Sequence, residues 1–133
     1  MDMHAKAVAE ACIRSSEDDS ISFPAQLTQL AQAGFEAYYV DFRRSVRIFY
    51  RSDGKSLELA TAPVITPVSE SFDAAAVGSA VRQSQAGTHT YREFCRKIVT
   101  AGCAAYLVSI LGRRVVYLGR TGETHIEHFP TAR

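Results

Sequence analysis

Tryptophan is missing from this chain of 133 residues, and cysteine, methionine and proline are scarce, with three, two and four copies. Three cysteines are an odd number, and none of them forms a Cys-x-x-Cys pair, which argues against a disulfide framework and a zinc knuckle. The sequence also has no glycine-rich phosphate loop and no Gly-x-Ser-x-Gly motif. It therefore lacks the common signatures of nucleotide-binding enzymes, serine hydrolases and small metal-stabilised domains, and we expect no metal and no cofactor.

The chain also has no excess of basic or acidic side chains. The chain has 15 basic and 14 acidic side chains and a formal net charge of +1, which gives no steering toward nucleic acid or acidic surfaces. Arg43, Arg44 and Arg47 form a basic cluster beside Asp41. This cluster is the one feature that favours a nucleic-acid role, and the balance of charges leads us to expect no nucleic-acid partner.

Long hydrophobic runs are also missing. The longest apolar-rich stretch, residues 103–111, is far shorter than a membrane span. Charged side chains at Asp2, Lys6 and Glu10 leave no apolar core for a signal peptide. We therefore expect a cytoplasmic protein without a membrane partner.

What the chain does contain is typical of a folded domain. Hydrophobic residues make up 47% of it and charged residues 22%, close to the averages for globular proteins. The length suits one domain. We therefore expect residues 1–133 to form a single domain.

The chain also resembles itself when it is shifted by 68 residues, which aligns residues 7–59 with 75–127 without a gap. The strongest match sets residues 33–40 against 101–108, where five of eight positions are identical. Self-similarity at a fixed spacing is the sign of an internal repeat.

The repeat predicts two tandem units, at about 5–60 and 73–129, joined by a linker over 61–72. Each unit has two segments with the apolar spacing of amphipathic helices, followed by three short alternating segments typical of strands. The predicted fold class is α+β. Two α-α-β-β-β repeats would be related by pseudo-twofold symmetry, with antiparallel strands packed on four helices.

Turn and cap residues support this plan in both units. Ser22 and Thr90 are good N-caps for the second helix of each unit. Gly34 and Gly102 stand where a left-handed residue would end that helix. In the strands that follow, Tyr38 and Tyr106 occupy matching inward positions, and we expect them to be paired core residues.

Several of these residues together resemble a known family. They are Ser22-Phe23-Pro24, Ala33-Gly34, Tyr38, Asp41, Tyr50, Asp53-Gly54, and near the C-terminus Tyr117-Leu118-Gly119-Arg120 and the stretch from Gly122 to Phe129. The pattern is similar to that of an uncharacterised bacterial and prophage family, domain of unknown function 1398, sometimes labelled phage envelope protein-like. The resemblance spans nearly the whole chain. It implies an α+β fold and no activity, because none is established for the family.

The densest group of possible catalytic side chains is His125, Glu127 and His128. On a strand, His125 and Glu127 share one face, where the first unit has two leucines. If both side chains face inward, a site would explain why polar groups replace apolar ones, because a buried unpaired charge is costly. If Ile126 faces inward instead, His125 and Glu127 lie in solvent, and we expect this second arrangement.

A second polar row consists of Tyr39, Asp41 and Arg43, on the face opposite Tyr38. The second unit has apolar residues or serine at the matching positions. Such an uneven surface suits a shallow pocket or a subunit contact, and an ordinary solvated sheet face is the plainer interpretation. The candidate ligand-binding residues are Tyr39, Arg43, Tyr50 and His128.

The sequence therefore predicts a non-enzymatic ligand-binding or protein-binding domain, with a homodimer as the expected assembly and an unidentified small molecule as a possible ligand. The alternative is a small enzyme or acid–base ligand site that uses His125 and Glu127 with Asp41.

Overall fold

The computed structural model describes residues 1–130, which form four helices and six strands. In chain order these elements are α1 (Met3–Asp18), α2 (Phe23–Gln32), β1 (Phe35–Asp41), β2 (Val46–Arg51), β3 (Ser56–Ala60), α3 (Ala74–Gln85), α4 (Tyr91–Thr100), β4 (Cys103–Ser109), β5 (Arg114–Gly119) and β6 (Thr124–His128). The prediction of an α+β fold is confirmed.

Local capping chemistry sets where the helices begin. Ser22 and Thr90 accept hydrogen bonds from the amides three residues later, and Thr90 and Glu93 form a capping box at the start of α4. Gly34 and Gly102 follow the ends of α2 and α4 with φ values of 92° and 95°. Glycine adopts this backbone without strain, so both helices end where the sequence predicted.

The six strands form one antiparallel sheet in the order β3-β2-β1-β4-β5-β6. Its centre is the pairing of β1 with β4, which sets Tyr39 opposite Leu107. Hydrogen bonds between the main chains of these two strands therefore join the first half of the chain to the second.

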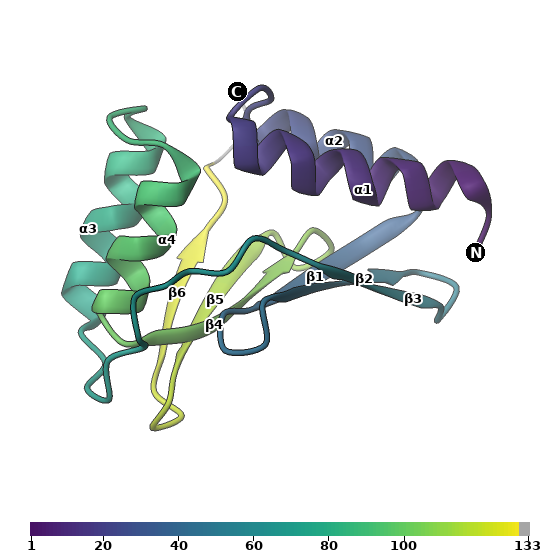
Figure 1. Ribbon diagram of the computed structural model, residues 1–133. Coiled ribbons are helices and arrows are strands. Elements are labelled where there is room, and N and C mark those ends of the chain that lie inside the picture. The colour runs from purple at the N-terminus through teal and green to yellow at the C-terminus, as the bar shows by residue number, and fades with distance from the viewer. Residues whose placement is uncertain (131–133) are drawn as a thin grey trace.

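All four helices lie on one face of this sheet. In Figure 1 the pair α1 and α2 covers the end formed by β1, β2 and β3, and the pair α3 and α4 covers the end formed by β4, β5 and β6. The core fills the space between helices and sheet, and its fully buried members include Leu30, Phe49, Val77, Ile98 and Val108. The other face of the sheet has no helix on it in the described structure.

The linker between β3 and α3 crosses the helix side of the sheet (Figure 1). Its ends are fixed: the amides of Thr61 and Ala62 donate to Ser45 and Glu17, and the amide of Ser69 donates to Val99. In the described structure residues 63–67 make no hydrogen bond. Ile65 in this stretch is 94% exposed, so the middle of the linker is held only by packing.

None of the helices over residues 1–130 combines the length and hydrophobicity needed to cross a membrane.

Candidate functional site

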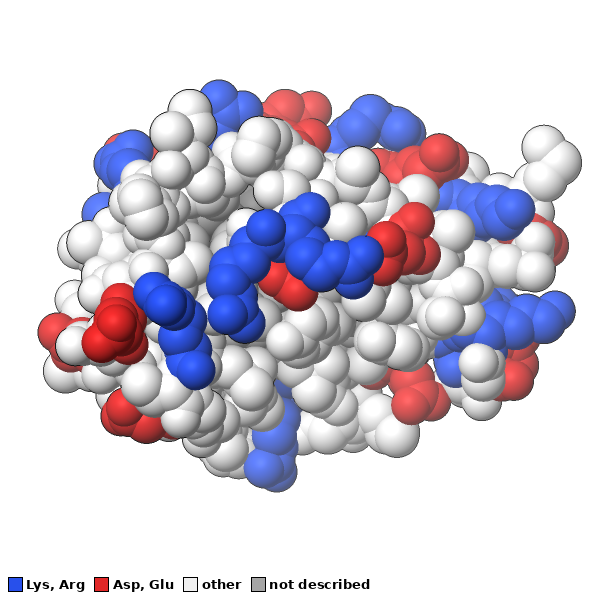
Figure 2. Space-filling model, turned by 60° about the horizontal axis from the view of Figure 1, so that its bottom comes forward, with Lys and Arg blue, Asp and Glu red and all other residues white. Residues whose placement is uncertain are grey.

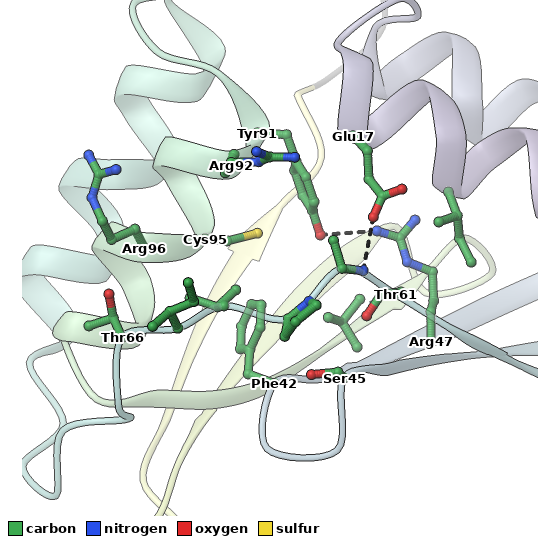
Figure 3. A pocket seen from close by; sticks show the side chains of 16 residues that line it. Glu17, Phe42, Ser45, Arg47, Thr61, Thr66, Tyr91, Arg92, Cys95 and Arg96 are labelled. Atoms are coloured by element: carbon green, nitrogen blue, oxygen red, sulfur yellow. Dashed lines mark hydrogen bonds between the residues drawn. The ribbon is translucent and has the colours of Figure 1, made fainter.

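Two cavities lie in the groove between the helix pairs. The first, which we call the arginine pocket, has a volume of about 330 Å³. Its lining comes from α1, α4, the sheet and the linker: Ile13, Glu17, Val40, Phe42, Ser45, Arg47, residues 61–66, Tyr91, Arg92, Cys95 and Arg96. Figure 3 shows Tyr91 and Glu17 pointing toward Arg47 across this space, whereas the Arg96 side chain points away from it.

The second cavity, the aromatic pocket, has a volume of about 630 Å³ and lies over β1, β4, β5 and β6. Seven aromatic rings line it: Phe23, Tyr38, Tyr91, Phe94, Tyr106, Tyr117 and Phe129. Tyr91 lines both cavities, so its side chain separates them.

Arg47 is the unusual residue of the arginine pocket. It lies at an inward position of β2 and is 2% exposed, among the largest side chains that are fully buried. One guanidinium nitrogen, Nη2, donates to the hydroxyl of Tyr91 at 3.0 Å. The guanidinium carbon lies 4.7 Å from the centre of the Tyr38 ring, a cation–π contact. Figure 3 shows Arg47 rising from the sheet toward Tyr91.

This buried cation has no carboxylate partner. Within residues 1–130, no Asp or Glu oxygen lies within 4 Å of Arg47, and its Nε–H has no hydrogen-bond partner. Burial disfavours the charged form of the guanidinium. The surrounding tyrosines Tyr38, Tyr91 and Tyr106, whose own pKa values burial raises, stay neutral and offer hydroxyls and rings rather than a counter-ion. Arg47 is therefore a cation whose hydrogen-bonding capacity is not filled by the protein.

A buried polar network continues from Arg47 into α1 and α2. Arg47 Nη1 lies 3.5 Å from the hydroxyl of Ser16, and the side-chain amide of Gln26 donates to the hydroxyls of Ser15 and Ser16 at 2.8 and 3.0 Å. The hydroxyl of Tyr91 also lies 2.7 Å from that of Tyr106. These groups have partners besides Arg47, so the network does not depend on it.

Two further arginines give the arginine pocket its charge. Arg92 and Arg96, one turn apart on α4, are exposed and line the rim. The pocket also contains Glu17, whose carboxylate accepts from the amide of Ala62 at 2.9 Å. Three cations and one carboxylate make this a net positive cavity.

His125 and Glu127 are brought together on the helix side of β6, where His125 Nε2 lies 2.5 Å from a Glu127 oxygen. Their side chains are 26% and 23% exposed. Gly78 of α3 packs closely against His125, since a Cβ atom added at Gly78 would lie 3.3 Å from His125 Nε2. Ile126 points the other way and is 44% exposed. The expectation that Ile126 faces inward and the pair lies in solvent is wrong.

Asp41 does not join this pair. Its carboxylate accepts from the amides of Arg43 and Arg44 at the β1–β2 turn. Its backbone partners are Val46 and Ala105, three strands from β6, or about 14 Å. The strand alternation also puts Asp41 on the sheet face opposite His125. The three candidate acid–base groups therefore do not form one site.

The other candidate ligand residues are spread over the molecule. Tyr39 and Tyr50 lie on the open face of the sheet, Arg43 is exposed in the β1–β2 turn, and His128 lines the aromatic pocket. Figure 2, which turns the lower side of the molecule toward the reader, shows basic and acidic side chains interspersed among uncharged surface. The three arginines at 43, 44 and 47 do not form one basic surface, because Arg47 is buried.

The sequence pattern of the family described as "Protein of unknown function (DUF1398)" matches residues 53–127, more than half of the chain. The chain belongs to this family. Uncharacterised proteins of Mycobacterium bovis and of two strains of Mycobacterium tuberculosis are 36% identical to it over 69 residues. That match covers 50% of this chain and 42% of each mycobacterial protein, so the chain matches less than half the length of these curated relatives.

The family name and the names of these relatives assign no activity. The phage envelope label attached to the resemblance stays an expectation.

Arg47 is the residue that sequence reasoning missed. It was grouped with its basic neighbours, although Phe49, two residues later, points into the core and fixes Arg47 on the same inward face. The 68-residue shift sets Arg47 against Val115, a buried apolar residue. A charged residue at a position where the other half has valine was the available signal.

The three cysteines are free and buried, and burial raises the pKa of Cys95, which lines the arginine pocket, to about 11. Over residues 1–130 there is no group of three or more His, Cys, Asp or Glu side chains that could hold a metal ion.

We expect Arg47→Met to leave the free energy of unfolding within about 1 kcal/mol of the wild type or to raise it, because removing a buried charge relieves its desolvation. Tyr91, Ser16 and Gln26 keep other hydrogen bonds. Arg51→Met is the matched comparison: Arg51 donates to the carbonyl of Ala33 at 2.6 Å, and its loss should cost about 1–2 kcal/mol. Urea denaturation measures both.

The opposite order of the two losses in the free energy of unfolding would contradict this interpretation of the site. If Arg47→Met loses several kcal/mol while Arg51→Met is nearly neutral, Arg47 serves stability and its unfilled hydrogen-bonding capacity has no bearing on function.

Proposed function

We propose that this protein is a ligand-binding domain that takes a small organic anion with an apolar body into the arginine pocket. The observation that carries the proposal is Arg47: a cation that is 2% exposed, has no carboxylate partner in the described structure and keeps an unpartnered Nε–H. A buried charge costs several kcal/mol unless it is paired. An anionic ligand supplies the pair.

The rest of the pocket suits such a ligand. Its volume of about 330 Å³ is within the range of small-molecule sites. Ile13, Val40, Phe42 and Cys95 offer apolar contact to the ligand body, and the exposed arginines at the rim attract its charge. Because residues 63–67 make no hydrogen bonds in the described structure, this stretch of the linker can shift to admit the ligand.

We also propose that the fold is a duplicated α-α-β-β-β unit, as the sequence predicted. Four residues of the first half with positive φ have counterparts 68 positions later with positive φ: Asp19 and Gly87, Gly34 and Gly102, Ser45 and Arg113, and Gly54 and Gly122. Strand register agrees with the same shift, since Tyr38 pairs with Val108 and Val40 pairs with Tyr106. Both observations support a twofold relation between the halves.

Under this relation the two pockets are counterparts. Eight lining residues of the arginine pocket have partners 68 positions away that line the aromatic pocket: Ile13 and Val81, Glu17 and Gln85, Val40 and Val108, Arg47 and Val115, Thr61 and Phe129, Ala62 and Pro130, Tyr91 and Phe23, and Arg92 and Pro24. Each charged residue in this set corresponds to an uncharged residue 68 positions away. The divergence therefore supports a ligand-specific role for Arg47 and Arg92.

Binding can be tested with benzoate, phenyl phosphate and the uncharged benzamide, followed by chemical shifts in NMR spectra of the full chain. We expect one or both anions to shift signals around Arg47 and Tyr91, and benzamide to bind at least about tenfold more weakly, since a charge-assisted hydrogen bond contributes about 1.5–3 kcal/mol. Arg47→Met should weaken anion binding by at least about tenfold.

Arg44→Gln is the matched control, because Arg44 is exposed on the open side of the molecule and pairs with Glu58. It should leave anion binding unchanged. Equal binding of benzamide and benzoate, or an effect of Arg44→Gln as large as that of Arg47→Met, would refute the assignment of the pocket.

A specific observation also supports the proposed homodimer. Five apolar side chains form one row across the open face of the sheet, from β2 to β6: Ile48, Tyr39, Leu107, Val116 and Ile126. A continuous apolar row on an uncovered sheet is typical of a protein contact. We propose that a second copy of the chain covers it through a twofold axis.

Light scattering during size-exclusion chromatography should therefore give twice the chain mass of 14.6 kDa, and Leu107→Glu should give the mass of one chain because it places a charge in the row. Lys55→Glu, in the β2–β3 turn, is the control and should stay dimeric. A wild-type protein that runs as one chain at high concentration would eliminate the dimer.

A further inference from the structure

With histidine counted as neutral, the side chains that line the two cavities of the groove carry opposite net charge. The arginine pocket contains three arginines and one carboxylate. The aromatic pocket is lined by two carboxylates, those of Asp19 and Glu127, and by no lysine or arginine within the described residues. An anion suits the first cavity, and the second calls for a different ligand.

Glu127 is the central charged group of the aromatic pocket. It lies inward on β6, opposite Val115, with its side chain 23% exposed. One of its carboxylate oxygens is bonded to His125, while the other, Oε1, makes no hydrogen bond in the described structure. The backbone of Arg47 on β2 is four strand spacings away, about 19 Å. In the described structure no lysine or arginine nitrogen lies within 4 Å of the Glu127 carboxylate.

Aromatic rings surround the space next to Glu127. Tyr106 forms part of the floor, next to Tyr38, whose ring also contacts the Arg47 guanidinium. Tyr117 lies beside the His125 ring at 6.4 Å between centroids, Phe94 comes from α4, and Phe129 comes from the segment that follows β6. The hydroxyl of Tyr106 is bonded to Tyr91. The faces of such rings carry partial negative charge and attract cations.

We propose that the aromatic pocket binds an organic cation, such as an ammonium group that carries one or two aromatic or alkyl substituents. The carboxylate of Glu127 would face the charge, and the rings would contact both the charge and the apolar substituents. The volume of about 630 Å³ holds a molecule of two rings. This site is separate from the arginine pocket and goes beyond the proposed anion binding.

Three probes of similar shape test the charge preference: dibenzyldimethylammonium, the uncharged dibenzyl ether and dibenzyl phosphate. In NMR titrations of the wild-type chain, the ammonium probe should shift signals of Val81, Val115 and Glu127. It should bind at least about tenfold more tightly than the ether, because cation–π contact and the carboxylate both act on its charge. This comparison requires no variant.

Glu127→Gln keeps the shape of the side chain and removes its charge, and it should weaken binding of the ammonium probe by about three- to tenfold. Glu10→Gln, at an exposed position of α1, should have no effect. Arg47→Met should leave binding of the ammonium probe intact even where it abolishes anion binding, which separates failure of one site from failure of the other.

The proposal is overturned if dibenzyl ether binds as tightly as the ammonium probe, if Glu127→Gln leaves the affinity unchanged, or if the ammonium probe shifts signals only around Arg47. A titration in which the ammonium probe gives no saturable shift would also overturn the proposal.

Discussion

The hydrogen bond between Arg47 and Tyr91 is the contact shared by the two pockets of the groove, and the proposed ligand chemistry depends on it. Arg47 comes from β2 in the first half of the chain and Tyr91 from α4 in the second, and their atoms meet at 3.0 Å above the middle of the sheet. Tyr91 continues to Tyr106 at 2.7 Å, so a chain of polar groups crosses the groove from one half to the other. This chain separates the arginine pocket from the aromatic pocket, and it holds a cation among neutral side chains, both aromatic and polar.

Placing a cation there is unfavourable for folding, and the groups around it offset the cost only in part. The ring of Tyr38 and the hydroxyls of Tyr91 and Ser16 contact the guanidinium, yet hydroxyls and rings compensate a full charge less well than a carboxylate does. The structure therefore combines a well-packed sheet-and-helix scaffold with one electrostatic need that the described residues do not meet. Both ligand proposals follow from the charges in the groove: the anion from Arg47 and its neighbours at the rim, the cation from Glu127 at the far end of the sheet.

Much of the fold was predictable because it depends on local rules. Caps at Ser22 and Thr90 and the glycines at 34 and 102 placed the helix ends, and side-chain alternation placed Tyr38 and Tyr106 in the core. The groove was not predictable, because it arises from how two helix pairs sit on one sheet, and sequence periodicity carries no information on that spacing. The orientation of β6 was predicted wrongly. Either Ile126 or its neighbours His125 and Glu127 could point inward, and hydrophobicity favoured the isoleucine. For Arg47 the available signal was a charged residue at an inward position of the strand, but the neighbouring arginines favoured an exposed basic cluster instead.

The most direct test of this account observes the Arg47 side chain itself, through the ¹H–¹⁵N resonance of its Nε–H group. In the free protein we predict a signal that exchanges slowly with solvent, as expected for a group that is buried, and that shifts strongly when benzoate is added because the carboxylate accepts its hydrogen bond. An Arg47 Nε–H that exchanges as fast as that of the exposed Arg44, or that stays unchanged while benzoate binds elsewhere on the protein, would contradict the central role given to this buried cation.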